Sequence, residues 1–206
     1  GRPFWVAGSC AFPEKLRAAH SLGAAGVQIG TAFAFCEESG LDAEIKNAVL
    51  AQSAAGTTTL FTDPRASPTG LPFKVVDVAG TVSRDDVYAA RERACDLGYL
   101  RQLYRREDGT TGYRCPAEPI ADFEKKGGDA ADAAGRKCLC NGLFAAIGLG
   151  DALPNGRTEP AIVTAGADVA EVARFVPPGK SSYPAADVLR FVIEALRPEG
   201  ACAQAG

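Results

Sequence analysis

The sequence lacks methionine altogether and contains a single histidine, His20. It also lacks an apolar run close to the roughly 18 residues that a membrane-spanning helix requires. With a net charge of −3 and a pI near 5.3, it does not have the basic field by which general nucleic-acid-binding proteins hold phosphates. No charged start is followed by an apolar segment, so no secretory signal is recognisable. We therefore expect a cytoplasmic protein that binds neither nucleic acid nor membranes, and we leave open whether it is a homo-oligomer.

The missing methionine bears on the extent of the chain. A complete, unprocessed chain begins with methionine, whereas this sequence opens at Gly1-Arg2-Pro3 directly before an apolar run. We expect the sequence to be the C-terminal part of a longer protein. The alternative is a complete protein whose start has been trimmed.

What the sequence does contain is a repeated pattern near its start. The apolar run 4–7 ends in Gly8-Ser9, a helical pattern occupies 13–22, and a second apolar run, 27–29, ends in Gly30-Thr31. A strand, a helix and a strand of this size make a βαβ unit whose two strands lie parallel, and the first strand is expected to be buried. Both small-residue turns then fall at the carboxyl ends of neighbouring strands, where their N–H groups can converge on one anion.

These residues also carry a resemblance to an enzyme family. The string AGS…LGAAGVQIGTAFAFCEESG resembles the phosphate-binding half of the nitronate monooxygenase (2-nitropropane dioxygenase) family, whose members are FMN-dependent (β/α)8 barrels. The resemblance implies that Ala7, Gly8, Ser9, Gly30 and Thr31 hold the FMN phosphate. Ser9 departs from the family, which has a glycine there, and a serine adds a hydroxyl donor but does not take a positive φ freely.

The resemblance implies an α/β fold: the C-terminal portion of a (β/α)8 TIM barrel with an irregular, α-rich extension. We expect residues 1–80 to form the last βα units of the FMN-binding barrel and residues 81–206 to form the extension. The implied activity is that of an FMN-dependent oxidoreductase that oxidises alkyl nitronates with O2. The alternatives are a flavin-dependent enoyl reductase of the same barrel class, and a non-catalytic fragment or metal-stapled binding module.

No catalytic residue is assigned from the sequence. The catalytic histidine of the family belongs to an earlier strand-end loop that this sequence does not contain. His20 lies late in the predicted helix 13–22, where an imidazole suits the negative end of the helix dipole. We expect it to have a surface or helix-end role.

Seven cysteines without a secretory signal predict free thiols in a reducing environment. Four of them, Cys95, Cys115, Cys138 and Cys140, fall in a polar segment of low periodicity, with the spacing C-x19-C-x22-C-x-C. Four thiolates can hold zinc or an iron–sulfur cluster, but this spacing lacks the C-x2-C pairs of zinc ribbons. We assign no metal ligands from the sequence, and both a metal site and scattered thiols stay open.

Elsewhere the patterns are ordinary. Asp42 is expected to cap a helix over 43–52, and Ser83 with Asp86 forms a capping box before a helix over 87–93. The segment 95–140 has the composition of an irregular insertion. Further predicted elements are a strand over 57–62, an apolar helix starting near 138, a short helix over 168–176 and an amphipathic helix over 184–196.

Overall fold

A computed structural model describes residues 1–152 and 156–194. The protein is mixed α/β with small sheets. It divides into two compact units, which we call the first unit (Gly1–Thr58 with Ala165–Gly206) and the second unit (Thr59–Thr164). The expected division at residue 80, between barrel units and an extension, stays a prediction. Within the described ranges, no helix is long and apolar enough to cross a membrane.

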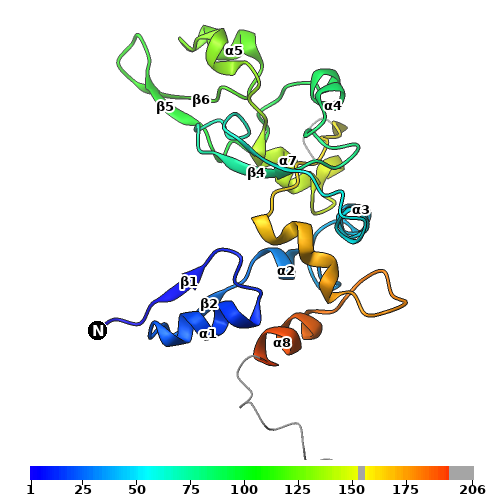
Figure 1. The fold of residues 1–206 in the computed structure, drawn as a ribbon. Helices are drawn as coiled ribbons and strands as arrows, with labels where there is room; N and C mark the ends of the chain where they lie inside the picture. The colour runs from blue at the N-terminus through cyan, green and yellow to red at the C-terminus, as the bar shows by residue number, and fades with distance from the viewer. Residues whose placement is uncertain (153–155, 195–206) are drawn as a thin grey trace, which may run out of the picture. The chain divides into compact units, whose positions relative to one another are not determined.

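The first unit begins with the predicted strand–helix–strand arrangement. It consists of β1 (Trp5–Ala7), α1 (Pro13–Ser21) and β2 (Gly26–Gln28), and α1 lies alongside the two strands (Figure 1). The strands pair in parallel, with Ala7 opposite Gln28, so both carboxyl ends lie at the same edge of the sheet. Pro13 begins α1. At the first helical position an N–H has no intrahelical hydrogen-bond partner, so the absence of one in proline costs no hydrogen bond.

The expectation that the first strand is buried was wrong. Phe4 and Trp5 are 45% and 55% exposed. Parallel strands are normally covered on both faces, but among the described strands β1 pairs only with β2. The apolar residues that indicated burial therefore meet solvent.

The rest of the first unit is helical, with α2 (Thr31–Ala34), α3 (Ala43–Ala54), η3 (Ala167–Phe175) and α8 (Ala185–Ile193). Asp42 caps α3 as predicted, because its carboxylate accepts hydrogen bonds from the N–H groups of Glu44 and Ile45. Ser53 of α3 donates to the carbonyl of Ala170, which joins α3 to η3. The predicted helix over 184–196 is confirmed for Ala185–Ile193, and its end lies outside the described residues.

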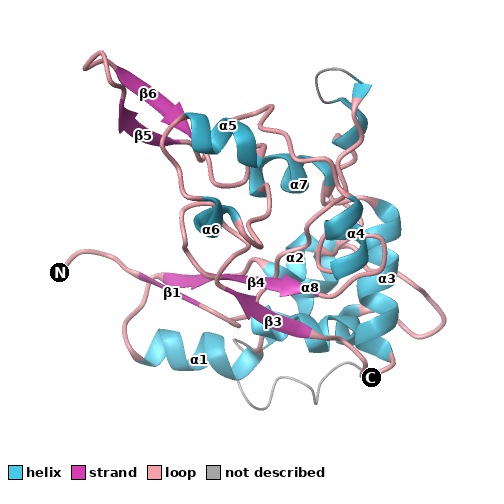
Figure 2. Cartoon of the chain, turned by 90° about the horizontal axis from the view of Figure 1, so that it is seen from above, coloured by secondary structure: helices cyan, strands magenta, loops and turns pink. Residues whose placement is uncertain are grey.

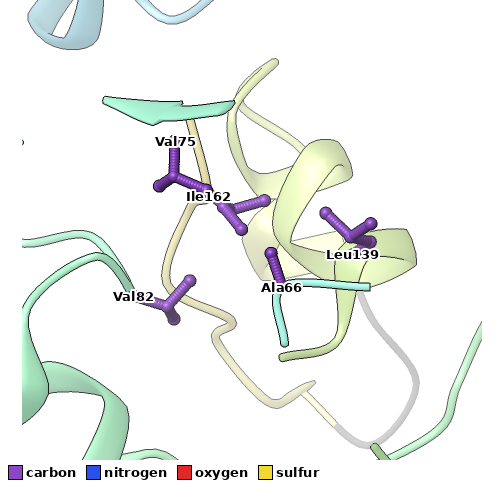
Figure 3. Close-up of a cluster of buried hydrophobic side chains, with 5 residues drawn as sticks. All are labelled: Ala66, Val75, Val82, Leu139 and Ile162. Carbon is purple, nitrogen blue, oxygen red and sulfur yellow. The ribbon is translucent and has the colours of Figure 1, made fainter. Parts of the chain in front are cut away.

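The second unit contains two antiparallel hairpins that form separate sheets (Figure 2). The expected strand near 57–62 is present as β3 (Leu60–Asp63), but it pairs antiparallel with β4 (Phe73–Val76). Beside β4, the apolar run 160–164 supplies the carbonyl of Val163 to the N–H of Val76. Side chains from the β3–β4 hairpin, the run 160–164, the segment after β4 and α7 (Leu139–Ala145) form a buried cluster (Figure 3), whose members are Ala66, Val75, Val82, Leu139 and Ile162.

Two local predictions in the second unit were wrong. The segment expected to be irregular contains the hairpin of β5 (Gln102–Arg105) and β6 (Thr111–Arg114). Its turn is made by Gly109 at a φ of 80°. Ser83 does not cap a helix, because its hydroxyl bonds Thr81 and Asp77 instead. The remaining helices are α4 (Asp85–Ala90), α5 (Ile120–Lys125), α6 (Ala130–Ala133) and η1 (Gly150–Ala152).

Candidate functional site

The carboxyl ends of β1 and β2 open into one hollow of about 390 Å³, which we call the strand-end hollow. All five residues predicted from the sequence line it. The parallel register explains why, since Ala7 and Gln28 are partners and the turns that follow them leave the sheet side by side. Its described lining consists of Ala7, Gly8, Ser9, Cys10, Gln28, Ile29, Gly30, Thr31, Gly166 and Asp168.

The first turn of the hollow has an unusual backbone. Gly8 has a φ of 97°, and Ser9 has a φ of 48°, the only positive φ of a non-glycine residue in the described chain. A side chain in this region of φ costs on the order of 1 kcal/mol, and such strain concentrates at functional sites. The buried thiol of Cys10 donates to the carbonyl of Gly8 and helps to hold the turn in this shape.

A methyl group at Gly8 would meet no atom within 4 Å. Glycine is therefore required at this position for its conformation and not for space. A serine is ill suited to a positive φ, yet the turn imposes one on Ser9.

The second turn begins at Gly30, which precedes α2. Gly30 is exposed, and a Cβ there would also meet nothing within 4 Å. Thr31 is buried, and its Oγ1 accepts a hydrogen bond of 2.8 Å from the N–H of Gly166. The threonine hydroxyl thus joins the second turn to a segment 135 residues further along the chain.

That third segment was not among the residues predicted from the sequence. Gly166 and Asp168 line the hollow, as do Gln28 and Ile29 at the end of β2. A signal was present, since Ala165-Gly166 follows the apolar run 160–164 just as Gly8-Ser9 and Gly30-Thr31 follow theirs. The repeated pattern of an apolar run followed by small residues could have identified a third wall of the hollow.

The electrostatics of the hollow are mixed. Asp168 brings a carboxylate that is 8% exposed, and no Lys or Arg is present among the described lining residues. An anion in the hollow would therefore depend on main-chain N–H groups and hydroxyls, with the charge of Asp168 opposing it. This composition suits hydrogen bonding from neutral donors better than attraction by a basic patch.

His20 lies outside the lining of the strand-end hollow. It is exposed in the last turn of α1. The surface, helix-end position expected for it is confirmed.

A larger hollow, of about 660 Å³, lies in the second unit between the β5–β6 hairpin and α5. It is basic, but most of its cations have partners: Lys126 pairs with Glu118, Lys125 pairs with Asp122, Arg114 donates to a main-chain carbonyl and Arg106 donates to Thr110. We assign it no ligand.

The cysteines of the second unit come together although they are distant in sequence. Cys115 and Cys138 are buried side by side, and Cys95 and Cys140 pack against them; we call these four residues the thiol cluster. All six cysteines in the described ranges are free thiols, as predicted. As the described side chains lie, no three His, Cys, Asp or Glu residues form a group that could hold a metal ion.

Comparison with models of protein families finds no family that matches this chain, and comparison with curated proteins finds no match either. The family resemblance therefore stays a prediction from the sequence. The geometry of the strand-end hollow is independent of it.

Proposed function

We propose that the chain forms the flavin-phosphate site of an FMN-dependent oxidoreductase of the nitronate monooxygenase type. The observation that carries the proposal is the strand-end hollow, into which two consecutive parallel strands direct their glycine-containing turns. Backbone N–H groups in turns of this kind are suited to phosphate, since small residues let the main chain approach it closely.

We further propose that the parallel strands belong to the C-terminal portion of a (β/α)8 barrel. In support, β1 and β2 form a two-stranded parallel sheet with Phe4 and Trp5 exposed. Parallel strands are otherwise found in sheets covered on both faces. Further parallel strands beside β1 would remove its open edge, and the helices that connect such strands would cover the apolar side chains.

The residues of the hollow fit a phosphate through neutral donors. In the proposed site the main-chain N–H groups of Gly8, Ser9, Gly30 and Thr31 donate to phosphate oxygens. The Ser9 hydroxyl adds a donor, and the small side chain of Ala7 allows close approach. The bound FMN would supply the redox chemistry, and the protein would hold and orient it. The carboxylate of Asp168 opposes the dianion and sets an upper limit on affinity.

Phosphate recognition is tested by titrating the full chain with FMN and with riboflavin, following the quenching of flavin fluorescence. We expect FMN to bind at least tenfold more tightly, because riboflavin lacks the group that would receive charge-assisted hydrogen bonds worth about 1.5–3 kcal/mol each. Equal affinities for the two flavins, or no binding of either, would refute the proposal.

A matched pair of variants tests whether the FMN phosphate binds in the strand-end hollow. Gly30→Asp places a carboxylate in the hollow, whereas Gly40→Asp places one at another exposed glycine where a Cβ also meets no atom within 4 Å. We expect Gly30→Asp to weaken FMN binding at least tenfold and Gly40→Asp to change it less than twofold. Equal effects of the two variants would place the flavin elsewhere.

The reaction type needs its own assay. Two assays distinguish the proposed nitronate monooxygenase from the enoyl reductase alternative. One measures oxygen uptake with propionate 3-nitronate, and the other measures NADPH oxidation in the presence of an enoyl thioester. We propose the first activity for the FMN-loaded protein that carries the family's strand-end histidine. Thioester-dependent NADPH oxidation without nitronate turnover would assign the enoyl reductase instead.

A further inference from the structure

A second hollow of the first unit lies along α3, and we call it the α3–η3 groove. Its volume is about 580 Å³, and it shares no described lining residue with the strand-end hollow. A volume of this size with a mostly apolar lining is typical of small-molecule sites. Three of the six apolar lining residues are alanines, whose small side chains leave the space open. The six are Leu50, Ala51, Ala54, Ala173, Val176 and Pro177.

The two walls of the groove are tied together by the side chain of Ser53. Its hydroxyl donates to the carbonyl of Ala170 at 2.9 Å and accepts from the N–H of Ala173 at 3.0 Å. Ser53 is buried, so water does not compete for these hydrogen bonds. They fix the spacing between α3 and η3, and the groove between the two helices is therefore preformed.

A tight turn holds Lys180 beside the groove. The N–H of Lys180 donates to the carbonyl of Pro177 at 3.0 Å. The two central positions are Pro178 and Gly179, and Gly179 has a φ of 76°. This is the pattern of a type II turn, which needs a fixed negative φ at its first central position and a positive φ at its second. The backbone that carries Lys180 is thus set by the local sequence.

Lys180 supplies the groove with a positive charge. Its side chain is exposed, and its Nζ has no hydrogen-bond or ion-pair partner among the residues that the structure describes. The described lining of the groove contains no Asp or Glu. The neighbouring Lys46, in contrast, is fully engaged, because its Nζ donates to three main-chain carbonyls. The groove therefore presents an uncompensated ammonium group beside apolar walls.

The polar and apolar residues of the groove occupy different ends. Asn47, Ala51 and Ala54 lie on one face of α3 at helical spacing, so this face changes from polar to apolar toward the end of the helix. An adjoining hollow of about 200 Å³ is lined by both Asn47 and Ser182. The loop that carries Lys180 therefore lies at the Asn47 end, and the opposite end is left to apolar groups.

We propose that the α3–η3 groove binds an aliphatic carboxylate of medium chain length. Its carboxylate lies at Lys180 and accepts a charge-assisted hydrogen bond from the ammonium group. Its alkyl chain lies between α3 and η3 and covers the apolar lining. A single ammonium group without an acidic neighbour in the lining matches a ligand with one negative charge. The binding is non-covalent and goes beyond the proposed flavin chemistry, which uses the strand-end hollow.

The first test is calorimetric titration of the full chain with decanoate and with decan-1-ol. We expect decanoate to saturate at one equivalent and decan-1-ol to bind at least tenfold more weakly, because the alcohol cannot form the charge-assisted hydrogen bond. Equal affinities for the two ligands, or decanoate binding that does not saturate, overturn the proposal.

The alkyl chain is tested with hexanoate, octanoate and decanoate on the wild-type protein. Burial of a methylene group is expected to raise the affinity about threefold to fourfold, so each step of two carbons should give about tenfold. An affinity that stays constant along the series would show that the chain remains in solvent, and it contradicts the proposal whatever any variant does.

Two matched pairs of variants locate the ligand. Lys180→Gln is expected to weaken decanoate binding at least fivefold and leave decan-1-ol unaffected, whereas Lys15→Gln, at an exposed lysine of α1, changes neither more than twofold. Ala51→Phe fills the groove and is expected to weaken both ligands at least tenfold, whereas Ala18→Phe, at an exposed alanine of α1, is not. Equal effects within either pair overturn the proposal.

A competition experiment separates this site from the flavin site. Decanoate affinity is expected to change less than twofold in the presence of excess FMN, because the two hollows share no described lining residue. Displacement of decanoate by FMN would place it in the strand-end hollow and overturn the proposal. Failure of FMN to bind would refute the proposed flavin function and leave the decanoate results unchanged.

Discussion

The contact most informative to perturb in the first unit is the hydroxyl of Tyr183. The residue is fully buried, and its Oη–H donates to the carbonyl oxygen of Ala32, with an O–O distance of 2.6 Å. Its ring packs against that of Phe175, with 5.4 Å between the ring centroids. Ala32 follows Thr31 in α2, so this hydrogen bond positions the helix that begins at the second turn of the strand-end hollow. Tyr183→Phe keeps the ring and removes only the O–H.

The expected cost follows from what is left behind. The lost hydrogen bond contributes about 1 kcal/mol, and a buried carbonyl deprived of its donor costs about 1–3 kcal/mol. We therefore expect Tyr183→Phe to lower the free energy of unfolding of the first unit by about 2 kcal/mol near pH 7. Tyr99→Phe is the matched control, because Tyr99 is 71% exposed and its change is expected to stay within about 0.5 kcal/mol.

The pH dependence gives a second, independent signature. Burial raises the pKa of Tyr183 above its ordinary value. Above about pH 10 the unfolded chain loses this proton while the folded chain keeps it. The folded protein then binds more protons, so wild-type stability falls as pH rises, by up to about 1.4 kcal/mol per pH unit from this residue. The variant lacks this contribution, so its deficit should shrink between pH 10 and pH 11.

Urea unfolding provides the assay. Trp5 is the only tryptophan and lies in the first unit, so its fluorescence follows that unit while circular dichroism follows the whole chain. A deficit below 0.5 kcal/mol at pH 7, or one that stays constant up to pH 11, would show that the Tyr183 hydrogen bond does not hold α2 in place.

Three further predictions concern single charges. Asp42→Ala should lower stability by about 1 kcal/mol through loss of the α3 cap, and Asp42→Asn should restore most of it; equal losses would deny capping. Glu159→Gln should cost about 3–5 kcal/mol in urea unfolding, because it leaves the buried guanidinium of Arg91 without its counter-charge; a change under 1 kcal/mol would contradict burial of this pair. Asp168→Asn should raise FMN affinity several-fold and leave riboflavin affinity unchanged. A fluorescence titration that shows no gain in FMN affinity would contradict a phosphate bound next to Asp168.

Local chemistry accounts for what the sequence predicted correctly. The cap by Asp42, the start of α1 at Pro13 and the turn at Gly8 each depend on residues within one or two turns of the chain. The parallel pairing of β1 with β2 needed only one short connection. These features brought Gly8, Ser9, Gly30 and Thr31 into one hollow without information from the rest of the chain.

Each incorrect prediction concerns a feature that depends on contacts outside the local stretch of sequence. The apolar run 4–7 predicts a buried strand, yet burial depends on what covers the strand. The sequence pattern predicts that Ser83 caps a helix, but its hydroxyl is hydrogen-bonded to the side chains of Thr81 and Asp77. The β5–β6 hairpin was missed because its strands are polar, and strand formation there depends on pairing across the turn.

Neighbours along the chain specify the two glycine-containing turns, their parallel strands and the α3 cap, so these features can be predicted from the sequence. The packing of distant segments, in contrast, brings Gly166 and Asp168 to the strand-end hollow and brings the four cysteines of the thiol cluster together. Such meetings depend on which surfaces bury one another and on which polar groups find partners far along the chain, as Thr31 and Gly166 do across 135 residues. A local pattern such as Ala165-Gly166 after its apolar run marks a candidate segment, but it does not specify which other segments that segment meets.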